Sequence, residues 1–215
     1  MTGSDIADIV WLSLRVSVVA AFLGLAIGAP LGAWICTLGS VGRRIWLTVF
    51  ATLLAVPTVV IGLIVYLALS RSGPLGWLDL LFTPTAIMIA QTLITLPVVT
   101  MFSHRACAEL WRTHGDAIRL DVPDVTRQVL HLMQMAKAGI AMAFLVAFGR
   151  AISEVGAVMI VGGNIRDATR VMTTAITLET RQGNFSVAIT LGVILLAVSL
   201  SVTLATWLLT QERPA

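Results

Sequence analysis

Residues 182–211 read QGNFSVAITLGVILLAVSLSVTLATWLLTQ and contain no charged side chain. Three more charge-free stretches, each of 25 or more residues, occupy 16–42, 45–70 and 80–104. A membrane-spanning helix needs about 20 consecutive apolar residues. These runs are continuously apolar and do not alternate in polarity, so they predict membrane-spanning helices and not the strands of a membrane barrel.

The composition of the whole chain agrees with this prediction. Of its 215 residues, 58% are hydrophobic and 12% are charged, and the mean hydropathy is +0.95. Soluble domains carry about 25% charged residues, and a soluble domain of this composition would leave too much apolar surface in water. Soluble globular and disordered classes are therefore excluded.

A fifth apolar stretch, residues 138–163, is interrupted by two charges, Arg150 and Glu154. With it, the sequence predicts a single all-α polytopic membrane domain over residues 1–215. The five predicted spans are about 9–37, 45–70, 84–103, 138–162 and 186–210.

Lys and Arg residues are divided unequally between the two sides that five spans create. If the long segment 104–137 is cytoplasmic, its side holds eight of them: Arg43, Arg44, Arg105, Arg112, Arg119, Arg127, Lys137 and Arg213. The other side holds four: Arg71, Arg166, Arg170 and Arg181. We therefore expect the N-terminus outside and the C-terminus inside. The net charge of +3 then reflects topology, and no basic face for nucleic acid is evident.

The segment 104–137 has a helical pattern of charge. Opposite charges recur three or four residues apart at Glu109, Arg112, Asp116 and Arg119, a spacing that supports a helix. A break follows at 121–124, where Asp121 suits an N-cap, Pro123 the first helical turn and Asp124 position N3. The sequence predicts a helix, a turn and a second helix from about 122 to Lys137 that enters the fourth span.

This cytoplasmic segment resembles the coupling segment of the permease subunits of ATP-binding-cassette (ABC) importers. The signature of that segment is Glu-Ala-Ala with a Gly six positions after the Glu. The favoured match covers Asp116, Ala117, Ile118 and Arg119, with Val122 in the place of the Gly. A second register, 109–111 with a Gly at 115, keeps the Gly but lies too far from the fourth span.

A longer resemblance, to the tungstate-importer permease family, covers nearly the whole chain. Its central run is GRAISEVGAVMIVGGNI (149–165), followed by TRVMTTAI (169–176) and LET (178–180). Upstream, four shorter stretches are similar as well: SLRVS (13–17), PTVVIG (57–62), GPLG (73–76) and LFTP (81–84). Molybdate and sulfate permeases share the architecture and a looser form of the central run, so they remain alternatives.

The resemblance implies a type I importer in the inner membrane of a prokaryote. Two copies of the chain would form the pore, two cytoplasmic ATPase subunits would bind ATP and Mg, and an external binding protein would deliver the oxyanion. The chain itself would bind no cofactor and would not be an enzyme. The residues agree on one point: the single lysine, Lys137, follows Ala136, which excludes a phosphate-binding loop.

Two groups of residues are candidates for the pore or gate. Arg150 and Glu154 lie four apart, so on a helix they share one face and can pair; they either line the pore or fix helix packing. In a pore for anions Arg150 would face the substrate and Glu154 would be neutralised or turned away. The second group, on the outer side, either forms a vestibule that binds the oxyanion or docks the binding protein: Gly163, Asn164, Thr169 and Arg170.

A hypothesis from a different class of protein assigns another role to Glu154. A secondary anion transporter could employ Glu154 as a proton relay, and it would need no ATPase. Metal chemistry is not expected, because the isolated thiols Cys36 and Cys107 do not form a metal site.

Overall fold

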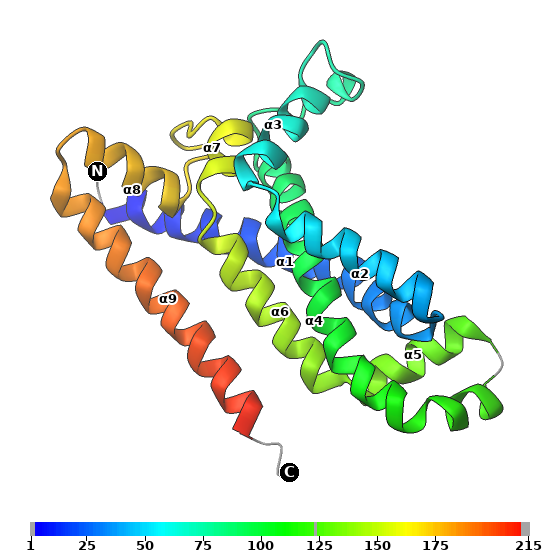
Figure 1. Cartoon of the computed structure of the whole chain (residues 1–215). Helices are drawn as coiled ribbons and strands as arrows, with labels where there is room; N and C mark the ends of the chain where they lie inside the picture. Colours follow the sequence, from blue (N-terminus) through cyan, green and yellow to red (C-terminus); the bar gives the residue numbers. More distant parts are fainter. Residues whose placement is uncertain (1–2, 123, 212–215) are drawn as a thin grey trace.

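The computed structural model describes residues 3–122 and 124–211, and that part of the chain contains helices and turns but no strand. The roles expected for Pro123 in a helical turn and for Arg213 on the cytoplasmic side fall outside the described residues. The elements follow one another as α1 (Gly3–Thr37), α2 (Ser40–Ala55), α3 (Thr58–Leu69), η1 (Gly76–Leu78), α4 (Pro84–Asp121), α5 (Val125–Met135), α6 (Lys137–Ile152), α7 (Gly156–Gly162), α8 (Met172–Arg181) and α9 (Phe185–Gln211) (Figure 1).

Three helices, α1, α4 and α9, are individually long and apolar enough to cross a membrane. They correspond to the first, third and fifth predicted spans. The second predicted span is not one helix, because the chain bends by 92° between α2 and α3. Pro57 stands at this bend, where its missing N–H and its ring prevent the helix from continuing.

The prediction of an unbroken fourth span over 138–162 is also wrong. Helix α6 has 16 residues, or about 24 Å at 1.5 Å per residue, which is shorter than the hydrocarbon core of about 30 Å. The rest of the stretch consists of a break at 153–155 and the short helix α7. Glu154 therefore lies beyond the end of α6, and its pairing with Arg150 is not across one helical face.

The long polar segment also differs from the expectation in its boundaries. Helix α4 runs without a break from 84 to 121, so the third predicted span and the first helix predicted for the segment 104–137 form a single rod. The predicted break between two helices is confirmed, since α4 ends at Asp121 and α5 begins at Val125. Asp124, not Asp121, is the N-cap of α5, and its side chain accepts a hydrogen bond from the Arg127 N–H at 3.1 Å. Helix α5 then meets α6 at 80° and does not run smoothly into it.

The core of the bundle is the contact between α1 and α4. Along α1, glycines recur every fourth residue at Gly24, Gly28 and Gly32, and this spacing lets two membrane helices approach closely. A Cβ at Gly32 would lie 2.5 Å from the Thr100 carbonyl oxygen, so no side chain fits there.

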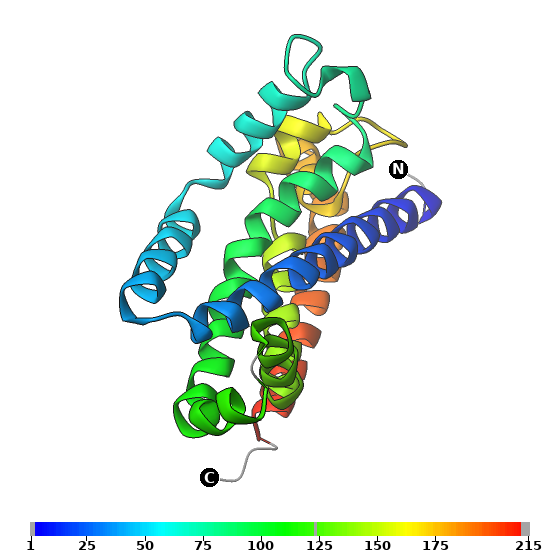
Figure 2. The same ribbon diagram turned by 90° about the vertical axis from the view of Figure 1, so that its right-hand side faces the viewer.

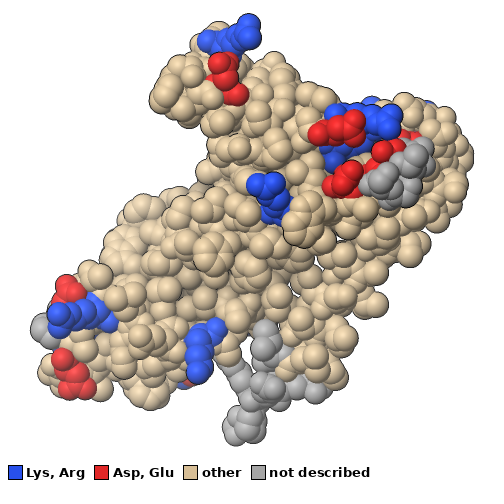
Figure 3. All heavy atoms as spheres, turned by 180° about the vertical axis from the view of Figure 1, so that it is seen from behind, with Lys and Arg blue, Asp and Glu red and all other residues tan. Residues whose placement is uncertain are grey.

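The remaining helices surround this pair. Helix α6 packs against both α1 and α4, while α9 lies along the outside and contacts α6 and α8 (Figures 1 and 2). Much of α9 is open, with Leu196, Leu200 and Trp207 all more than half exposed. On the face seen in Figure 3, charged side chains gather towards the ends of the molecule, and the area between them is uncharged apart from an isolated basic patch. Such a belt suits a lipid environment.

Candidate functional site

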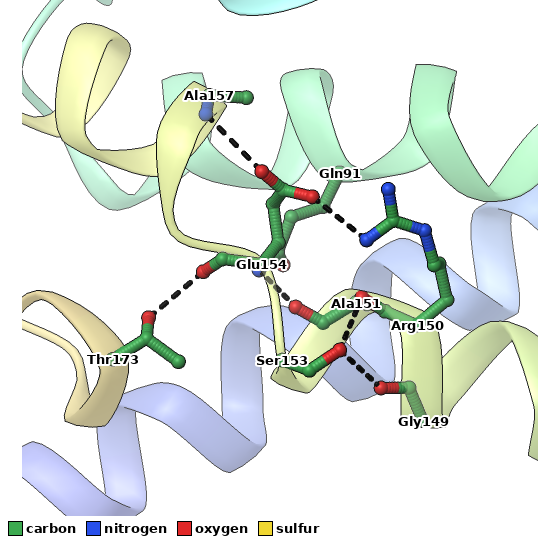
Figure 4. Close-up of polar contacts among 8 residues, drawn as sticks. All are labelled: Gln91, Gly149, Arg150, Ala151, Ser153, Glu154, Ala157 and Thr173. Atoms are coloured by element: carbon green, nitrogen blue, oxygen red, sulfur yellow. Dashed lines mark hydrogen bonds and ion pairs between the residues drawn. The ribbon is translucent and has the colours of Figure 1, made fainter. Parts of the chain in front are cut away.

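The break between α6 and α7 is built around a buried carboxylate (Figure 4). Glu154 Oε2 accepts a hydrogen bond from Arg150 Nη1 at 2.9 Å, and its Oε1 accepts one from the Ala157 N–H at 3.2 Å. The Glu154 side chain is 3% exposed, whereas that of Arg150 is 42% exposed. The carboxylate thus has partners on both oxygens, while the Arg150 side chain remains partly exposed.

The end of α6 is stabilised by side chains that replace the missing helical hydrogen bonds. A helix terminus leaves its last carbonyls without partners in the helix. Ser153 Oγ donates to the carbonyls of Gly149 at 2.9 Å and Arg150 at 3.2 Å. From α4, Gln91 Nε2 donates to the Ala151 carbonyl at 2.9 Å. The helix can therefore end inside the bundle without leaving these groups bare.

Helix α8 holds the other side of the break. Thr173 Oγ1 donates to the Glu154 carbonyl at 2.8 Å, and both residues are buried. The break thus ties together α4, α6, α7 and α8. Sequence reasoning identified Arg150 and Glu154, but it missed Gln91 and Thr173, because their partners lie far away along the chain.

The loop after α7 contains the other pore candidates. Gly163 and Asn164 both have positive φ, at 68° and 52°, so the chain reverses sharply there. Thr169 is fully buried; its hydroxyl donates to the Gly162 carbonyl and accepts from the Ile165 N–H at 3.0 Å. Thr169 therefore shapes the loop, and its hydroxyl is not open to a ligand.

A cavity of about 280 Å³ lies between this loop and the first turns of α1. Arg166 and Arg170 line it, and Arg166 pairs with Asp5 at 3.1 Å. Within the part of the chain that the structure describes, the buried Nε of Arg170 has no hydrogen-bond partner. Asp8 and Asp167 line the same cavity, so the arginines share it with carboxylates, and a vestibule role for Arg170 stays a prediction.

The coupling candidates lie at the end of α4. Asp116 and Ala117 are exposed, whereas Ile118 is buried. Arg119 lies 3.9 Å from Asp116 and stacks over the ring of Trp111, 5.0 Å from its centre. These side chains therefore present a polar surface on a rigid helix end.

Val122 stands at the turn itself. Its N–H donates to the Ile118 carbonyl at 2.9 Å, and its carbonyl accepts from Gln128 Nε2 at 2.7 Å. In the alternative register the Gly would be Gly115, which lies inside α4, buried against Trp111. The turn therefore comes at Val122 and not at Gly115, and the match of Asp116 to the coupling segment stays a prediction.

Charge interactions continue along the polar part of α4, beyond the predicted span. Arg112 Nη2 donates to Glu109 Oε1 at 2.6 Å, and this hydrogen bond, together with the positive charge, lowers the pKa of Glu109. Among the described residues, no group of three His, Cys, Asp or Glu side chains could hold a metal ion. This part of α4 therefore offers cationic and hydrogen-bonding groups.

Comparisons with known proteins bear on the family. No model of a protein family matches the chain. A probable anion ABC transporter permease of Haloferax volcanii is 43% identical over 202 residues, covering 92% of this chain and 87% of that protein. The tungstate uptake permease TupB of Peptoclostridium acidaminophilum is 36% identical over 212 residues, covering 97% and 91%. Molybdenum and sulfate permeases match at lower identity.

The fold has a counterpart among solved structures. The inward-facing methionine ABC transporter MetNI matches over 100% of both chains with a TM-score of 0.72, at 15% sequence identity. That likeness concerns the fold alone. The Haloferax and Peptoclostridium permeases, in contrast, are more than one-third identical to this chain over nearly its whole length. The chain therefore belongs to the anion ABC transporter permeases, the family of membrane subunits that includes the tungstate uptake permeases.

Proposed function

We propose that this chain is the permease subunit of a tungstate importer, and that two copies form the translocation pore. The observation that carries the proposal is the 36% identity to a tungstate uptake permease over 97% of the chain. Permeases named for molybdenum and sulfate are 24% and 28% identical, so they do not favour the alternative substrates. A proton relay through Glu154 is not favoured either, because both of its carboxylate oxygens are already hydrogen-bonded.

Arg150 is the proposed contact for the oxyanion. A charge within the membrane costs at least about 2.5–3.5 kcal/mol, and the bond to Glu154 offsets part of this cost. The partly exposed Arg150 side chain suits a tetrahedral anion, since charge-assisted hydrogen bonds from Arg to oxyanions are strong and directional. Glu154 acts as the positioning residue, because it holds Arg150 at the break while remaining buried itself.

The outer loop is the proposed entrance from an external binding protein. The chain reverses direction at Gly163 and Asn164, and the Thr169 hydroxyl stabilises the loop by accepting a hydrogen bond from the Ile165 N–H. Three carboxylates, Asp5, Asp8 and Asp167, also line the cavity beside α1, and Arg166 is paired with Asp5 and Asp167. The proposed contact for an arriving dianion is therefore Arg170, whose Nε has no hydrogen-bond partner among the described residues.

The end of α4 is the proposed contact with a separate ATPase subunit, which would bind ATP and Mg. Asp116, Ala117 and Arg119 supply the exposed surface, while Ile118 and Val122 fix the turn. Because α4 is continuous from 84 to 121, a displacement of this end moves the transmembrane part of the same rod. The proposal places the N-terminus outside and the C-terminus inside an inner membrane.

The test is transport by the reconstituted system. Permease, ATPase and binding protein are placed in proteoliposomes, and internal tungsten, molybdenum and sulfur are measured by mass spectrometry. We expect ATP-dependent tungstate uptake that survives a proton uncoupler and falls at least tenfold in Arg150→Gln, with Arg71→Gln as the matched control. Preferential uptake of sulfate or molybdate would refute the substrate, and normal transport by Arg150→Gln would refute its role in the pore.

A further inference from the structure

A basic cavity of about 730 Å³ lies beside the polar part of α4. Arginines dominate the charged residues that line it: Arg43, Arg105, Arg112 and Arg119, with Glu109 as the carboxylate. Glu109 is already bound by Arg112 at 2.6 Å. Positive charge therefore exceeds negative charge in the cavity, which favours an anion.

Two polar groups at this cavity lack partners. Arg43 Nη2 donates to the carbonyls of Cys36 and Leu38 at 3.0 and 3.1 Å, so the side chain caps the end of α1. Over residues 3–122 and 124–211, however, the buried Arg43 Nε and His104 Nε2 have no hydrogen-bond partner. Such groups are costly unless a further partner is present.

An apolar groove of about 520 Å³ adjoins the basic cavity. Arg43 lines both hollows, so they meet at this residue. The groove follows one stripe of α2 along α4, with Arg44 at the same end as Arg43, then Leu47 and Ala51, and Met101 opposite. These apolar residues fall inside the second and third predicted spans, so they lie at the depth of lipid tails.

The neighbouring aromatic side chains indicate the same depth. Trp34 and Trp46 pack edge to face with their ring centres 5.8 Å apart. Tryptophan is enriched where the hydrocarbon core meets the headgroups. Arg43 and Arg44, a few residues from Trp46, therefore lie at headgroup level.

We propose that the cavity and the groove together bind one anionic phospholipid, with its phosphate on Arg43, Arg44 and Arg105 and an acyl chain along α2. Basic pockets between membrane helices are suited to acidic headgroups. A cytoplasmic protein cannot reach the apolar groove, and free phosphate has no use for it. The site goes beyond the transport function and does not depend on which side of the membrane it faces.

The test uses the full chain with its ATPase in nanodiscs of phosphatidylethanolamine with 10% phosphatidylglycerol. The complex is released with detergent, and the lipids that stay bound are counted by native mass spectrometry. We expect one retained phosphatidylglycerol per permease. Each arginine near the surface contributes about 1 kcal/mol, or about fivefold in affinity. The double variant Arg44→Gln/Arg105→Gln should therefore weaken retention about 25-fold, while the charge-matched pair Arg71→Gln/Arg181→Gln should not.

A second variant separates lipid from free phosphate. Ala51→Phe fills the groove and keeps every arginine, so it should also reduce retention, whereas inorganic phosphate at 10 mM should not displace the lipid. Displacement by phosphate, or full retention in Ala51→Phe, would overturn the lipid assignment. Full retention in the double arginine variant would overturn the site. A single elution peak of the intact complex shows that each variant is folded, and no readout depends on transport.

Discussion

Removing the carboxylate of Glu154 should destabilise the protein far more than removing a similar carboxylate at the surface. In Glu154→Ala, Arg150 loses a charge-assisted bond of 2.9 Å, and the Ala157 N–H loses its acceptor in a buried position. Bonds to charged groups are worth about 1.5–3 kcal/mol, and a buried unsatisfied group costs about 1–3 kcal/mol. Because Arg150 is 42% exposed and can be rehydrated, we take the low end of the first range and expect about 3 kcal/mol in total.

Glu154→Gln separates the two contributions. The amide oxygen can still accept from the Ala157 N–H, but the amide NH2 cannot accept from Arg150, so the charge-assisted bond to Arg150 is lost and we expect about 1.5 kcal/mol. Glu109→Ala is the matched control, since it removes another Glu bonded to an Arg, here with side chains that are 70% and 76% exposed. Exposed pairs contribute little, so its free energy of unfolding should stay close to that of the parent protein.

The measurement is reversible unfolding in mixed micelles, with the fraction of dodecyl sulfate raised stepwise and helix content followed by circular dichroism. The expected order of stability is parent and Glu109→Ala together, then Glu154→Gln, then Glu154→Ala. If Glu154→Ala unfolds at the same detergent fraction as Glu109→Ala, the carboxylate does not hold the break.

Three further predictions concern packing, coupling and the break. Gly32→Val should prevent a folded, monodisperse product in size-exclusion chromatography, because the new Cβ would lie 2.5 Å from a backbone oxygen of α4. The control Gly39→Ala should elute normally, because a Cβ there meets nothing within 4 Å. Equal elution of the two variants would contradict the close contact between α1 and α4. Asp116→Lys should keep ATPase activity while uptake in vesicles falls at least tenfold, and unchanged uptake would contradict a coupling role. Thr173→Val should lose about 1 kcal/mol of unfolding free energy in the micelle titration. The control is Thr177→Val, which removes a hydroxyl that bonds only within its own helix. Equal losses in the two variants would show that the bond from Thr173 to the break contributes no more than a bond within a helix.

Hydropathy was sufficient to locate α1, α4 and α9, because the apolar length of a segment is a property of that segment alone. The break between α4 and α5 was equally local, although the sequence predicted Asp121 as the N-cap and the structure has Asp124. The glycine spacing along α1 is a further local signal for a close helix contact, although the predicted spans did not depend on it. These features need no knowledge of distant residues.

The break at 153–155 is different, because a continuous helix and a broken one have the same hydropathy. What distinguishes them is the set of partners for the freed backbone groups, and these come from Gln91 on α4 and Thr173 on α8. The spacing of Arg150 and Glu154 predicted their pairing on one face of a continuous helix. The two residues do pair, but α6 ends at Ile152, before Glu154. The pair forms because the chain leaves the helix, so its carboxylate can also cap α7.

The two broken spans are connected through their short halves. A Cβ at Gly62 of α3 would lie 2.6 Å from the Cα of Ala157, and one at Gly156 of α7 would lie 2.7 Å from the Val59 side chain. Helices α3 and α7 therefore touch almost backbone to backbone.

A straight continuation of either span would carry its short half away from the other, because α3 departs from α2 by 92° and α7 begins only after the turn at Glu154. Two residues thus allow the contact between α3 and α7. Pro57 ends the helix before α3 by removing a backbone donor, and Glu154 supports the start of α7 by accepting a hydrogen bond from the Ala157 N–H. Since that same carboxylate also holds Arg150, any force that separates α3 from α7 acts directly on the position of the half-exposed guanidinium.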